Sequence, residues 1–336
     1  MDRRYNIQTA LHSTFKVGGE AHSLIRVADA ADVAHAYRTA RAEGISVIPM
    51  GSGSNILMPD GAVNAMLIQS ADEHISFVLK KQAVHLTVGA GVVWDDVVAL
   101  AVSRGWWGIE NLSGIPGTVG GAVVQNIGAY GAVLSDVVES ISVYDTIEQK
   151  AITISRARAD FGYRTSIFKK SHGRYFVMRV TLLLSLHATP RIGYKDLDEY
   201  FKHVGSTTIA EIRNAVLHIR ARKFPPLDTY GTAGSFFLNP VVTRDVAEEL
   251  QSRYAAMPLF DLPEGGTKVP LAWLLEHVVK VHGMRIGGAF VWPQQSLVIV
   301  TDNTATSADV RMLAQKIVQR VYDVVQIKIS PEVHII

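Results

Sequence analysis

The chain has 336 residues, a length that favours two or three domains over a single core. Hydrophobic residues make up 48%, charged residues 19%, and the formal net charge is +2, so the composition indicates a globular protein without the basic patch of a nucleic-acid binder. The absence of cysteine excludes disulfides and a cysteine nucleophile, no metal site is expected, and the polar N-terminus and lack of a long apolar run predict a cytoplasmic protein without signal peptide or membrane span.

The first half of the chain predicts alternating helices and strands. Residues 29–44 predict a helix that a glycine ends, with Val33 and Tyr37 on one face. The other expected elements are strands at 45–50, 75–79 and 84–88, of which the last two form a hairpin, a helix at 94–104, a glycine-rich stretch at 108–131, and strands at 137–144 and 175–186.

The second half begins near residue 206. Thr208 and Glu211 have the spacing of a capping box ahead of apolar residues at helical intervals, so a helix starts there. Residues 223–226, Lys-Phe-Pro-Pro, predict a linker. The expected later elements are helices from Thr243, Pro270 and Ser307 and strands at 297–301 and 325–329. This alternation predicts a small α+β domain.

Two glycine-rich loops stand out in the first half. PMGSGSNIL covers residues 49–57, and SGIPGTVGGAVVQNIGAYG covers residues 113–131 with six glycines. Glycine adopts positive φ and lets the backbone approach a ligand closely. Successive free N–H groups also form concave anion sites, which suit phosphates. We therefore expect a phosphate-bearing ligand, and we expect Gly121 to need both positive φ and close approach.

Neither standard nucleotide loop fits these glycines. The first loop follows a strand, but residues 56–61 cannot continue as the helix that a dinucleotide fingerprint requires. The sequence also lacks the Gly-Lys-Ser or Gly-Lys-Thr of a Walker loop. Simple tight turns stay an alternative for the first loop. They are less favoured for the second, because ordering six glycines beside Asn126 costs entropy that a ligand must offset.

Together the loops resemble the flavin-binding signature of the UDP-N-acetylenolpyruvoylglucosamine reductases. The resemblance implies that backbone amides of both loops wrap the pyrophosphate of FAD. The implied cofactor-binding residues are Gly51, Ser52, Gly53, Ser54, Asn55, Ile56, Ser113, Gly114, Ile115, Pro116, Gly117, Thr118, Gly120, Gly121, Ala122, Asn126, Gly128 and Ala129. The FAD is expected to be non-covalent, because the loops offer no cysteine and no suitably placed histidine.

The resemblance also implies the fold class and the domains. We expect an α+β protein with a two-subdomain FAD-binding fold of the vanillyl-alcohol oxidase type and a C-terminal α+β substrate domain. Subdomain 1 is expected over residues 1–68 with the C-terminal strand 325–336, subdomain 2 over 69–206, and the substrate-binding domain over 207–324. The insertion at 193–204 and the length of the third domain resemble the longer type of this family.

Three further stretches match the family in the family's order. They are FGYRTSIFK at 161–169, GSFFLNP at 234–240 and SPEVHII at 330–336. Taken singly, Arg164 and Glu332 fit an ordinary salt bridge, and Ser235 fits a turn. Arg164 is nevertheless a planar cation suited to a carboxylate. Within the matched stretches, the resemblance makes Arg164, Ser235 and Glu332 the catalytic residues.

The family's reaction supplies their roles. NADPH reduces FAD, and the flavin then delivers a hydride to the enolpyruvyl ether of UDP-N-acetylglucosamine, which gives UDP-N-acetylmuramate for peptidoglycan synthesis. The resemblance implies that Arg164 and Glu332 polarise the substrate carboxylate, where charge accumulates, and that Ser235 donates the proton. The cofactor carries the hydride chemistry and the protein orients it.

Substrate-binding positions of the family match five further residues. They are Tyr163, Tyr194, Lys223, Asn239 and Gln295. For Lys223, a solvated linker cation is the alternative. Two positions depart from the family, because His282 stands for a lysine and Phe260 for a lid tyrosine. Both departures are expected to affect the affinity for the UDP moiety more than the catalytic reaction.

Two other functions stay open. A related flavin oxidase or dehydrogenase with another substrate would turn over rapidly with O₂, although Tyr163, Arg164 and Ser235 argue against it. A non-catalytic nucleotide-sugar sensor is opposed by the intact catalytic set. The expected partners are the UDP-sugar and NADPH, without nucleic acid or membrane, and a monomer is expected.

Overall fold

The computed structural model describes residues 2–202, 207–262 and 265–336 and divides the chain into two compact units. Unit 1 comprises Met1–Ile7, Ala21–Ser52 and Val63–Arg220, and unit 2 comprises Gln8–Glu20, Gly53–Ala62 and Ala221–Ile336. The expected boundary at residue 206 and the end of the 193–204 insertion lie outside the described residues. The division into three domains stays a prediction.

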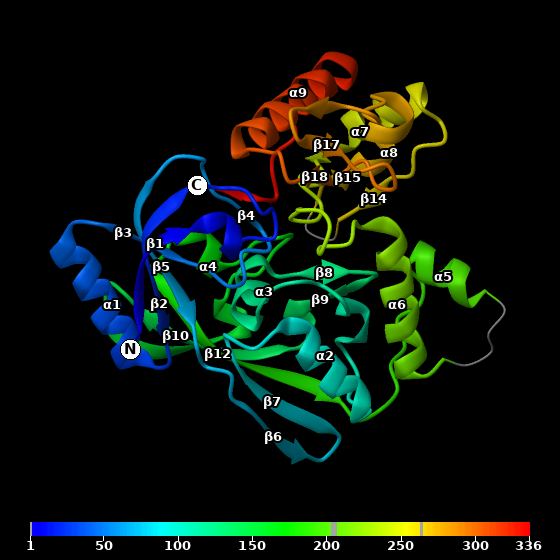
Figure 1. Ribbon diagram of the computed structural model, residues 1–336. Helices are drawn as coiled ribbons and strands as arrows, with labels where there is room; N and C mark the ends of the chain where they lie inside the picture. The colour runs from blue at the N-terminus through cyan, green and yellow to red at the C-terminus, as the bar shows by residue number, and fades with distance from the viewer. Residues whose placement is uncertain (1, 203–206, 263–264) are drawn as a thin grey trace. The chain divides into compact units, whose positions relative to one another are not determined.

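A four-stranded sheet of unit 1 has the order β1-β2-β5-β3 (Figure 1). Its strands are β1 (Arg3–Gln8), β2 (Glu20–Val27), β3 (Ser46–Pro49) and β5 (Val63–Ser70). β2 and β3 run parallel to β5, and α1 (Ala30–Glu43) connects β2 to β3. The Asp29 carboxylate caps α1. Gly44 at φ +67° ends the helix, which confirms the predicted glycine stop.

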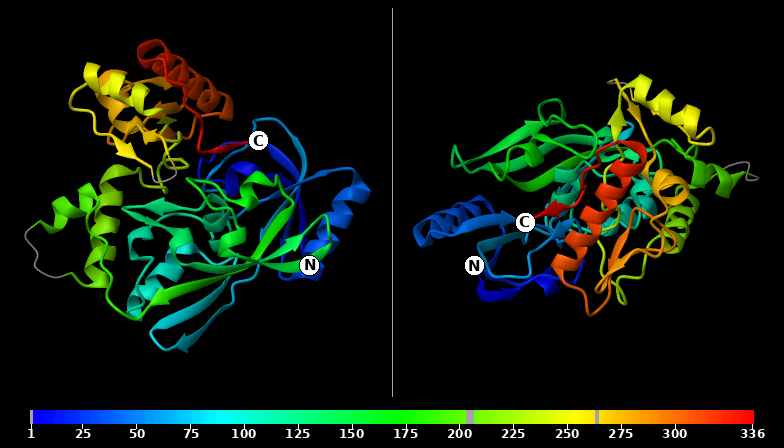
Figure 2. Two further views of the ribbon diagram at one scale, coloured as in Figure 1. Left: turned by 180° about the vertical axis from the view of Figure 1, so that it is seen from behind. Right: turned by 90° about the horizontal axis from the view of Figure 1, so that it is seen from above.

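The second sheet of unit 1 is antiparallel, with five strands in the order β11-β10-β12-β7-β6. The strands are β6 (Ile75–Lys80), β7 (Ala83–Gly89), β10 (Val138–Asp145), β11 (Lys150–Ser155) and β12 (Tyr175–Ser185). Figure 2 shows this sheet from behind, with the β6–β7 hairpin at its edge. The predicted hairpin and the two predicted later strands are confirmed. The helices α2 (Trp94–Ser103) and α3 (Val119–Gln125) share its main hydrophobic core.

The helix α3 lies inside the glycine-rich stretch and was not predicted. Thr118 caps it, because its Oγ1 accepts the Gly121 N–H at 3.5 Å, and Asn126 ends it at φ +44°. Two glycines in the first turn lower helix propensity. The fully buried Val119 and Val123 therefore hold this helix through tertiary packing.

Several short elements complete unit 1 around the second loop. They are η2 (Glu110–Leu112), β8 (Gly128–Ala129), β9 (Ala132–Val133), η3 (Leu134–Asp136), η4 (Arg156–Arg158), α4 (Ile167–Lys170) and α5 (Lys195–Phe201).

The helix α6 (Ile209–Lys223) carries the chain out of unit 1. The capping box is confirmed, because the Glu211 N–H donates to Thr208 Oγ1 (3.2 Å) and the Thr208 N–H donates to Glu211 Oε2 (2.8 Å). Buried Ile212 and Val216 pack in one hydrophobic cluster with residues of α5. Lys223 is the last residue of this helix, so it does not open a linker.

The described residues of unit 2 form three small sheets, ordered β13-β15-β14, β16-β17-β18 and β19-β4. The strands are β4 (Ile56–Leu57), β13 (Val241–Val242), β14 (Phe260–Asp261), β15 (Thr267–Lys268), β16 (Arg285–Ile286), β17 (Ala289–Val291), β18 (Ile299–Thr301) and β19 (His334–Ile335). The helical elements are η1 (Thr9–His12), α7 (Arg244–Arg253), α8 (Leu271–Trp273), the π-helical turn Leu274–Val278 and α9 (Ser307–Val325). The helices predicted from Thr243, Pro270 and Ser307 are confirmed.

The predicted strand at 325–329 is wrong. α9 extends through Val325, because Val321 and Val325 continue the stripe of buried residues on this helix, and Gln326 ends it at φ +57°. Residues 326–330 have no regular secondary structure. In the expected C-terminal strand 325–336, only β19 is a strand, and it runs parallel to β4.

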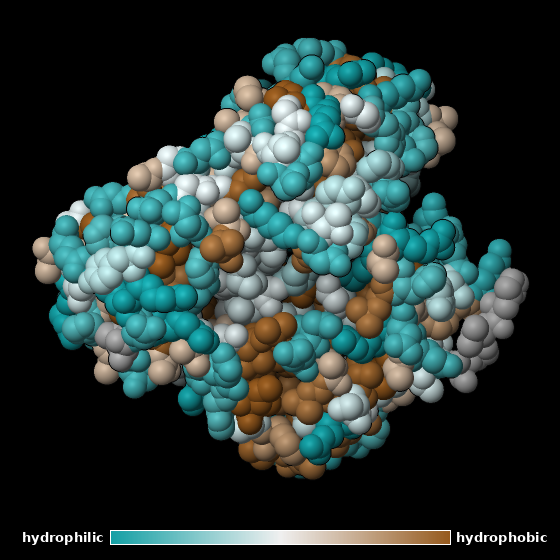
Figure 3. All heavy atoms as spheres, viewed as in Figure 1, coloured by the Kyte–Doolittle hydropathy of each residue, from teal (hydrophilic) through white to brown (hydrophobic). Residues whose placement is uncertain are grey.

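Hydrophobic side chains gather at the surface over the β6–β7 hairpin (Figure 3). On the edge strand β6, Phe77 is 43%, Val78 56% and Leu79 59% exposed. Lys80 at the strand end adds a charge, a common protection of an exposed edge. None of the described helices is long and apolar enough to cross a membrane.

Candidate functional site

The second glycine-rich loop lies along the connection between β7 and α2. Three backbone hydrogen bonds join the two segments, from Trp94 N–H to Gly117 C=O (3.0 Å), from Val119 N–H to Val92 C=O (2.9 Å) and from Gly120 N–H to Ala90 C=O (3.0 Å). The buried indole of Trp94 donates a fourth, to Leu112 C=O (2.9 Å). These bonds fix the loop backbone to the core of unit 1.

Glycine is required at several points of the loop. Gly114 and Gly117 have φ of +68° and +128°, a region that other residues rarely adopt. At Gly51 in the first loop, a Cβ would lie 2.5 Å from Thr118 Oγ1. The two loops therefore meet where Gly51 approaches Thr118, and a side chain at Gly51 would separate them.

Gly121 has a different environment. It lies in the first turn of α3 and does not have positive φ, so the expectation that it needs positive φ is wrong. A Cβ at Gly121 would meet nothing nearer than Thr118 Oγ1 at 3.8 Å. Its missing side chain thus leaves open space beside the loop. Such space suits the close approach of a diphosphate, so the residues present fit FAD.

Arg164 lies in a tight turn of unit 1. Two backbone hydrogen bonds between Gly162 and Thr165 close the turn (3.0 and 3.2 Å), and Arg164 has φ +54°. Its Nη2 donates to Gly128 C=O in the second loop (2.5 Å). The guanidinium is therefore oriented directly by the loop backbone.

The C-terminal end of α3 holds this turn in place. Lys169 Nζ donates to Arg164 C=O (3.1 Å) and to Gln125 Oε1 (2.8 Å). Asn126 Nδ2 donates to Gly162 C=O (3.0 Å), and Ser166 Oγ donates to Val124 C=O (2.8 Å). The turn that carries Arg164 and the second loop therefore form one structural piece.

Two predicted substrate residues lie near Arg164. The Tyr163 ring has its centroid 5.7 Å from Arg164 Cζ, within cation–π range. Tyr194, which precedes α5, lies within electrostatic reach of both residues and meets the edge of the Tyr130 ring at 5.6 Å. Burial raises the pKa of Tyr130 to about 12, so this phenol stays protonated at neutral pH.

Ser235 and Glu332 lie on paired segments of unit 2. The Glu332 N–H donates to Phe236 C=O (2.8 Å), and Phe237 pairs with Pro331. The fully buried Phe236 ring anchors this pairing. Ser235 precedes Phe236 in the chain, so unit 2 brings the predicted serine and acid close together. Arg164 belongs to unit 1.

The first loop is tied to the same C-terminal stretch. Asn55 Nδ2 donates to Glu332 C=O (3.1 Å), and the His334 N–H donates to Asn55 C=O (3.0 Å). Gly53 has φ +70°, and a Cβ there would lie 2.1 Å from His12 C=O. Residues up to Ser52 belong to unit 1, so this loop contributes residues to both units.

The remaining substrate candidates and the two departures lie at the end of α6 or in unit 2. Asn239 Oδ1 accepts the Leu271 N–H at the start of α8 (2.9 Å), and Gln295 lies in the turn between β17 and β18. His282 Nε2 lies 3.2 Å from Ser296 Oγ. The Phe260 ring faces the Lys268 ammonium at 5.3 Å.

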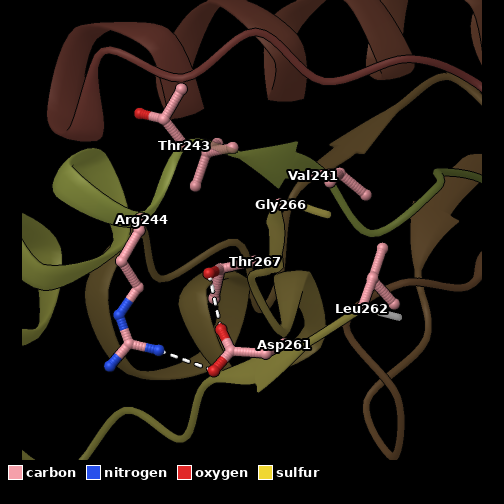
Figure 4. A pocket seen from close by; sticks show the side chains of 8 residues that line it. Val241, Thr243, Arg244, Asp261, Leu262, Gly266 and Thr267 are labelled. Carbon is pink, nitrogen blue, oxygen red and sulfur yellow. Dashed lines mark hydrogen bonds and ion pairs between the residues drawn. The ribbon is translucent and has the colours of Figure 1, made fainter. Parts of the chain in front are cut away.

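A surface depression of about 800 Å³ lies beside β13 and β15 (Figure 4). Arg244 Nη1 donates to Asp261 Oδ2 (2.6 Å), and Thr267 Oγ1 donates to Asp261 Oδ1 (2.8 Å). These groups satisfy one another, and none of the eight lining residues is a predicted site residue. The depression therefore gives no argument for a ligand.

Lys169 and Tyr130 were not predicted as site residues. Lys169 closes the matched stretch FGYRTSIFK, which was the available signal, but its contact with Arg164 C=O depends on a left-handed turn. Tyr130 follows the predicted Ala129 in the second loop and has φ +49°. The left-handed conformations of Arg164 and Tyr130 could not be predicted, because neither residue type is typical of positive φ.

The class of protein follows from the first half of the chain. Residues 21–147 match the family model of an FAD binding domain. This match covers both loops, and it includes their meeting point at Gly51 and Thr118. The chain is a flavin-dependent oxidoreductase of α+β fold, as the sequence predicts.

Residues 225–336 match the model of the C-terminal domain of UDP-N-acetylenolpyruvoylglucosamine reductase. Relatives with that name are 34% identical in Neisseria gonorrhoeae, over 98% of this chain and 96% of the relative, and 36% identical in Porphyromonas gingivalis, over 99% of each chain. The Thermus caldophilus enzyme of that name shares the fold, with a TM-score of 0.69 and 23% identity over 99% of this chain and 98% of that one. The chain belongs to the UDP-N-acetylenolpyruvoylglucosamine reductase family.

Proposed function

We propose that this chain reduces the enolpyruvyl ether of UDP-N-acetylglucosamine to UDP-N-acetylmuramate, with NADPH as the hydride donor and non-covalent FAD as the carrier. When bound, FAD supplies the hydride transfer from NADPH to the enolpyruvyl group. The observation that carries the proposal is the network in unit 2 that joins Asn55 of the first loop, Glu332 and the segment of Ser235. It links the first loop to the backbone segments that carry two candidate catalytic residues.

The two loops would hold the cofactor through their backbones. No residue between 113 and 131 carries a charge, so backbone N–H groups are the natural donors to the diphosphate. The proposed FAD contacts comprise the residues of the two loops named above, from Gly51 to Ile56 and from Ser113 to Ala129. The open space beside Gly121 supports this assignment.

Three side chains would act on the substrate. Arg164 can bind the substrate carboxylate with its planar fork, and its bond to Gly128 C=O preorganises it. Glu332 would act with it, and Ser235 would deliver a proton to the carbon beside the carboxylate. A serine is a weak acid, but a carbon that bears developing negative charge is basic enough to take its proton.

Five side chains would position the UDP-sugar. Tyr163 and Tyr194 lie near Arg164, while Lys223, Asn239 and Gln295 would contact the nucleotide side. The Asn239 side-chain carbonyl accepts the Leu271 N–H, which holds this amide in a fixed orientation. The separate substrate domain at 207–324, the monomeric state and the cytoplasmic location are part of this proposal.

The proposal is tested on the purified holoenzyme without oxygen. NADPH should bleach the flavin absorbance, and the enolpyruvyl substrate should restore it with formation of UDP-N-acetylmuramate. UDP-N-acetylglucosamine, which lacks the enolpyruvyl group, serves as the control and should restore nothing. Acid precipitation should release the flavin. Protein that binds no FAD, or reduced flavin that only O₂ reoxidises, would contradict the proposal.

A further inference from the structure

Gly114 in the second loop is bonded on both of its polar groups. Its N–H donates to Asp95 Oδ1 (2.6 Å), and its C=O accepts from Arg220 Nε (3.0 Å). A Cβ on Gly114 would lie 2.8 Å from Leu217 Cδ2 and 3.3 Å from the Arg220 side chain. The loop at this point therefore packs closely against α6: a side chain would displace Leu217 and Arg220, and the φ of +68° also favours glycine.

The two bonding partners belong to one charged cluster of unit 1. Arg213 binds Asp95 with both of its terminal nitrogens (2.6 and 2.8 Å). Burial by itself raises the pKa of Asp95, but the Arg213 ion pair and the Gly114 N–H outweigh it and hold that pKa below its usual range. Asp95 is thus ionised at neutral pH, and it also lies in the first turn of α2, where a negative charge is favourable.

Arg220 belongs to the same cluster. It lies within electrostatic reach of Asp95, and its guanidinium stays protonated in proteins. Arg213 and Arg220 are seven residues apart on α6, which is about two helical turns, so both project toward the same side. The loop from 113 to 131 has no charged residue of its own.

We propose that Asp95, Arg213 and Arg220 form a clamp that sets the conformation of the second loop for the FAD diphosphate. The inference rests on the proposed role of this loop as the FAD site. The three side chains are positioning residues, because they act through the Gly114 backbone.

The experiment measures FAD affinity and needs no turnover. Free-flavin fluorescence over a dilution series of the full-length holoenzyme gives the Kd for wild type, Arg220→Met, Arg220→Lys and Asp95→Asn. Arg222→Met is the matched control, because Arg222 is exposed on the same helix. We expect Arg220→Met to raise the Kd about tenfold to a hundredfold, the scale of a lost hydrogen bond to a charged group. Arg220→Lys should recover part of the loss, because its ammonium can donate to Gly114 C=O, although without the Nε geometry.

The outcomes separate the clamp from the FAD site. Circular dichroism shows whether each variant folds. If Arg220→Met does not fold, Asp95→Asn tests the clamp instead, because it alters the acceptor of the Gly114 N–H. It should also raise the Kd for FAD. If Arg220→Lys and Asp95→Asn both bind FAD with the same Kd as the control Arg222→Met, the clamp proposal is wrong. If Gly121→Val weakens FAD binding while the clamp variants do not, only the clamp is wrong. If Gly121→Val also leaves the Kd unchanged, the loop is not the FAD site.

Discussion

At the scale of single residues, the conformation around the second loop is held against local preference. Asn126, Tyr130 and Arg164 have φ between +44° and +54° although none is glycine. Each such residue costs about 1–3 kcal/mol, and such conformations cluster at functional sites. The hydrogen bonds from Asn126 and Lys169 to the Arg164 turn offset that cost. The strained conformation of Arg164 is thus consistent with a preorganised guanidinium.

Lys169→Met should slow the substrate half-reaction without affecting the NADPH half-reaction. The substitution removes the bonds to Arg164 C=O and Gln125 Oε1, and a small displacement of a reacting group can cost about a hundredfold in rate. Stopped-flow absorbance on each half-reaction measures the effect. Lys170→Met is the control, because Lys170 is exposed and pairs with Asp160. Equal rates in the two variants would show that Lys169 does not position Arg164.

Gly121→Val should weaken FAD binding while the fold persists. The new side chain enters open space and needs no positive φ, so the free energy of unfolding should change little. If a diphosphate occupies that space, forcing it away should raise the Kd about tenfold or more. Gly61→Val is the control, because the space around Gly61 is also open and Gly61 lies outside the predicted FAD contacts. An unchanged Kd for Gly121→Val would place the cofactor elsewhere.

At the scale of elements, local signals decided what the sequence could predict. The cap and glycine stop of α1 and the capping boxes of α6 and α9 act over a few residues, so these helices were predictable. The helix α3 was not predictable, because its glycines disfavour a helix and only the tertiary packing of Val119 and Val123 stabilises it. At 325–329 the β-branched run suits a strand, but the buried stripe of α9 continues through Val325.

The candidate site divides in the same way. The glycine-rich loops and the motifs of Arg164, Ser235 and Glu332 were visible in the sequence. The pairing of Phe236 and Phe237, next to Ser235, with the Glu332 segment joins residues far apart in the chain, and the Gly114 clamp joins two helices. Contacts of this kind leave no local pattern, so the structure was needed to find them.

Asp145→Asn tests the end of β10. Asp145 is buried and accepts hydrogen bonds from Arg174 (2.7 Å) and from the N–H groups of Ile147 and Glu148, and the Arg174 guanidinium lowers the pKa of this carboxyl. A lowered pKa stabilises the fold above the unfolded pKa of about 4, and this stabilisation is lost as pH falls through the folded pKa.

The midpoint of thermal unfolding should therefore fall in Asp145→Asn at pH 7, and its difference from wild type should shrink below about pH 4. Asp160→Asn, at an exposed ion pair, should change the midpoint little at either pH. A difference for Asp145→Asn that does not depend on pH would mean that packing, not charge, explains the effect.

At the scale of the whole molecule, the chain passes between the two units several times. Unit 2 takes the segments Gln8–Glu20 and Gly53–Ala62 from the first part of the chain and combines them with Ala221–Ile336. The first loop crosses from unit 1 to unit 2 after Ser52.

The catalytic assignment is tested most directly by Ser235→Ala in the two half-reactions, followed separately by stopped-flow absorbance. NADPH should reduce the bound FAD at nearly the wild-type rate, because that step needs no proton from Ser235. Reoxidation by the enolpyruvyl substrate should slow about 10²–10⁴-fold, the usual worth of a positioned acid. Ser235→Cys should keep partial activity, and Ser252→Ala, on the exposed side of α7, should behave as wild type. Reoxidation of Ser235→Ala at the wild-type rate would contradict the role of Ser235 as proton donor.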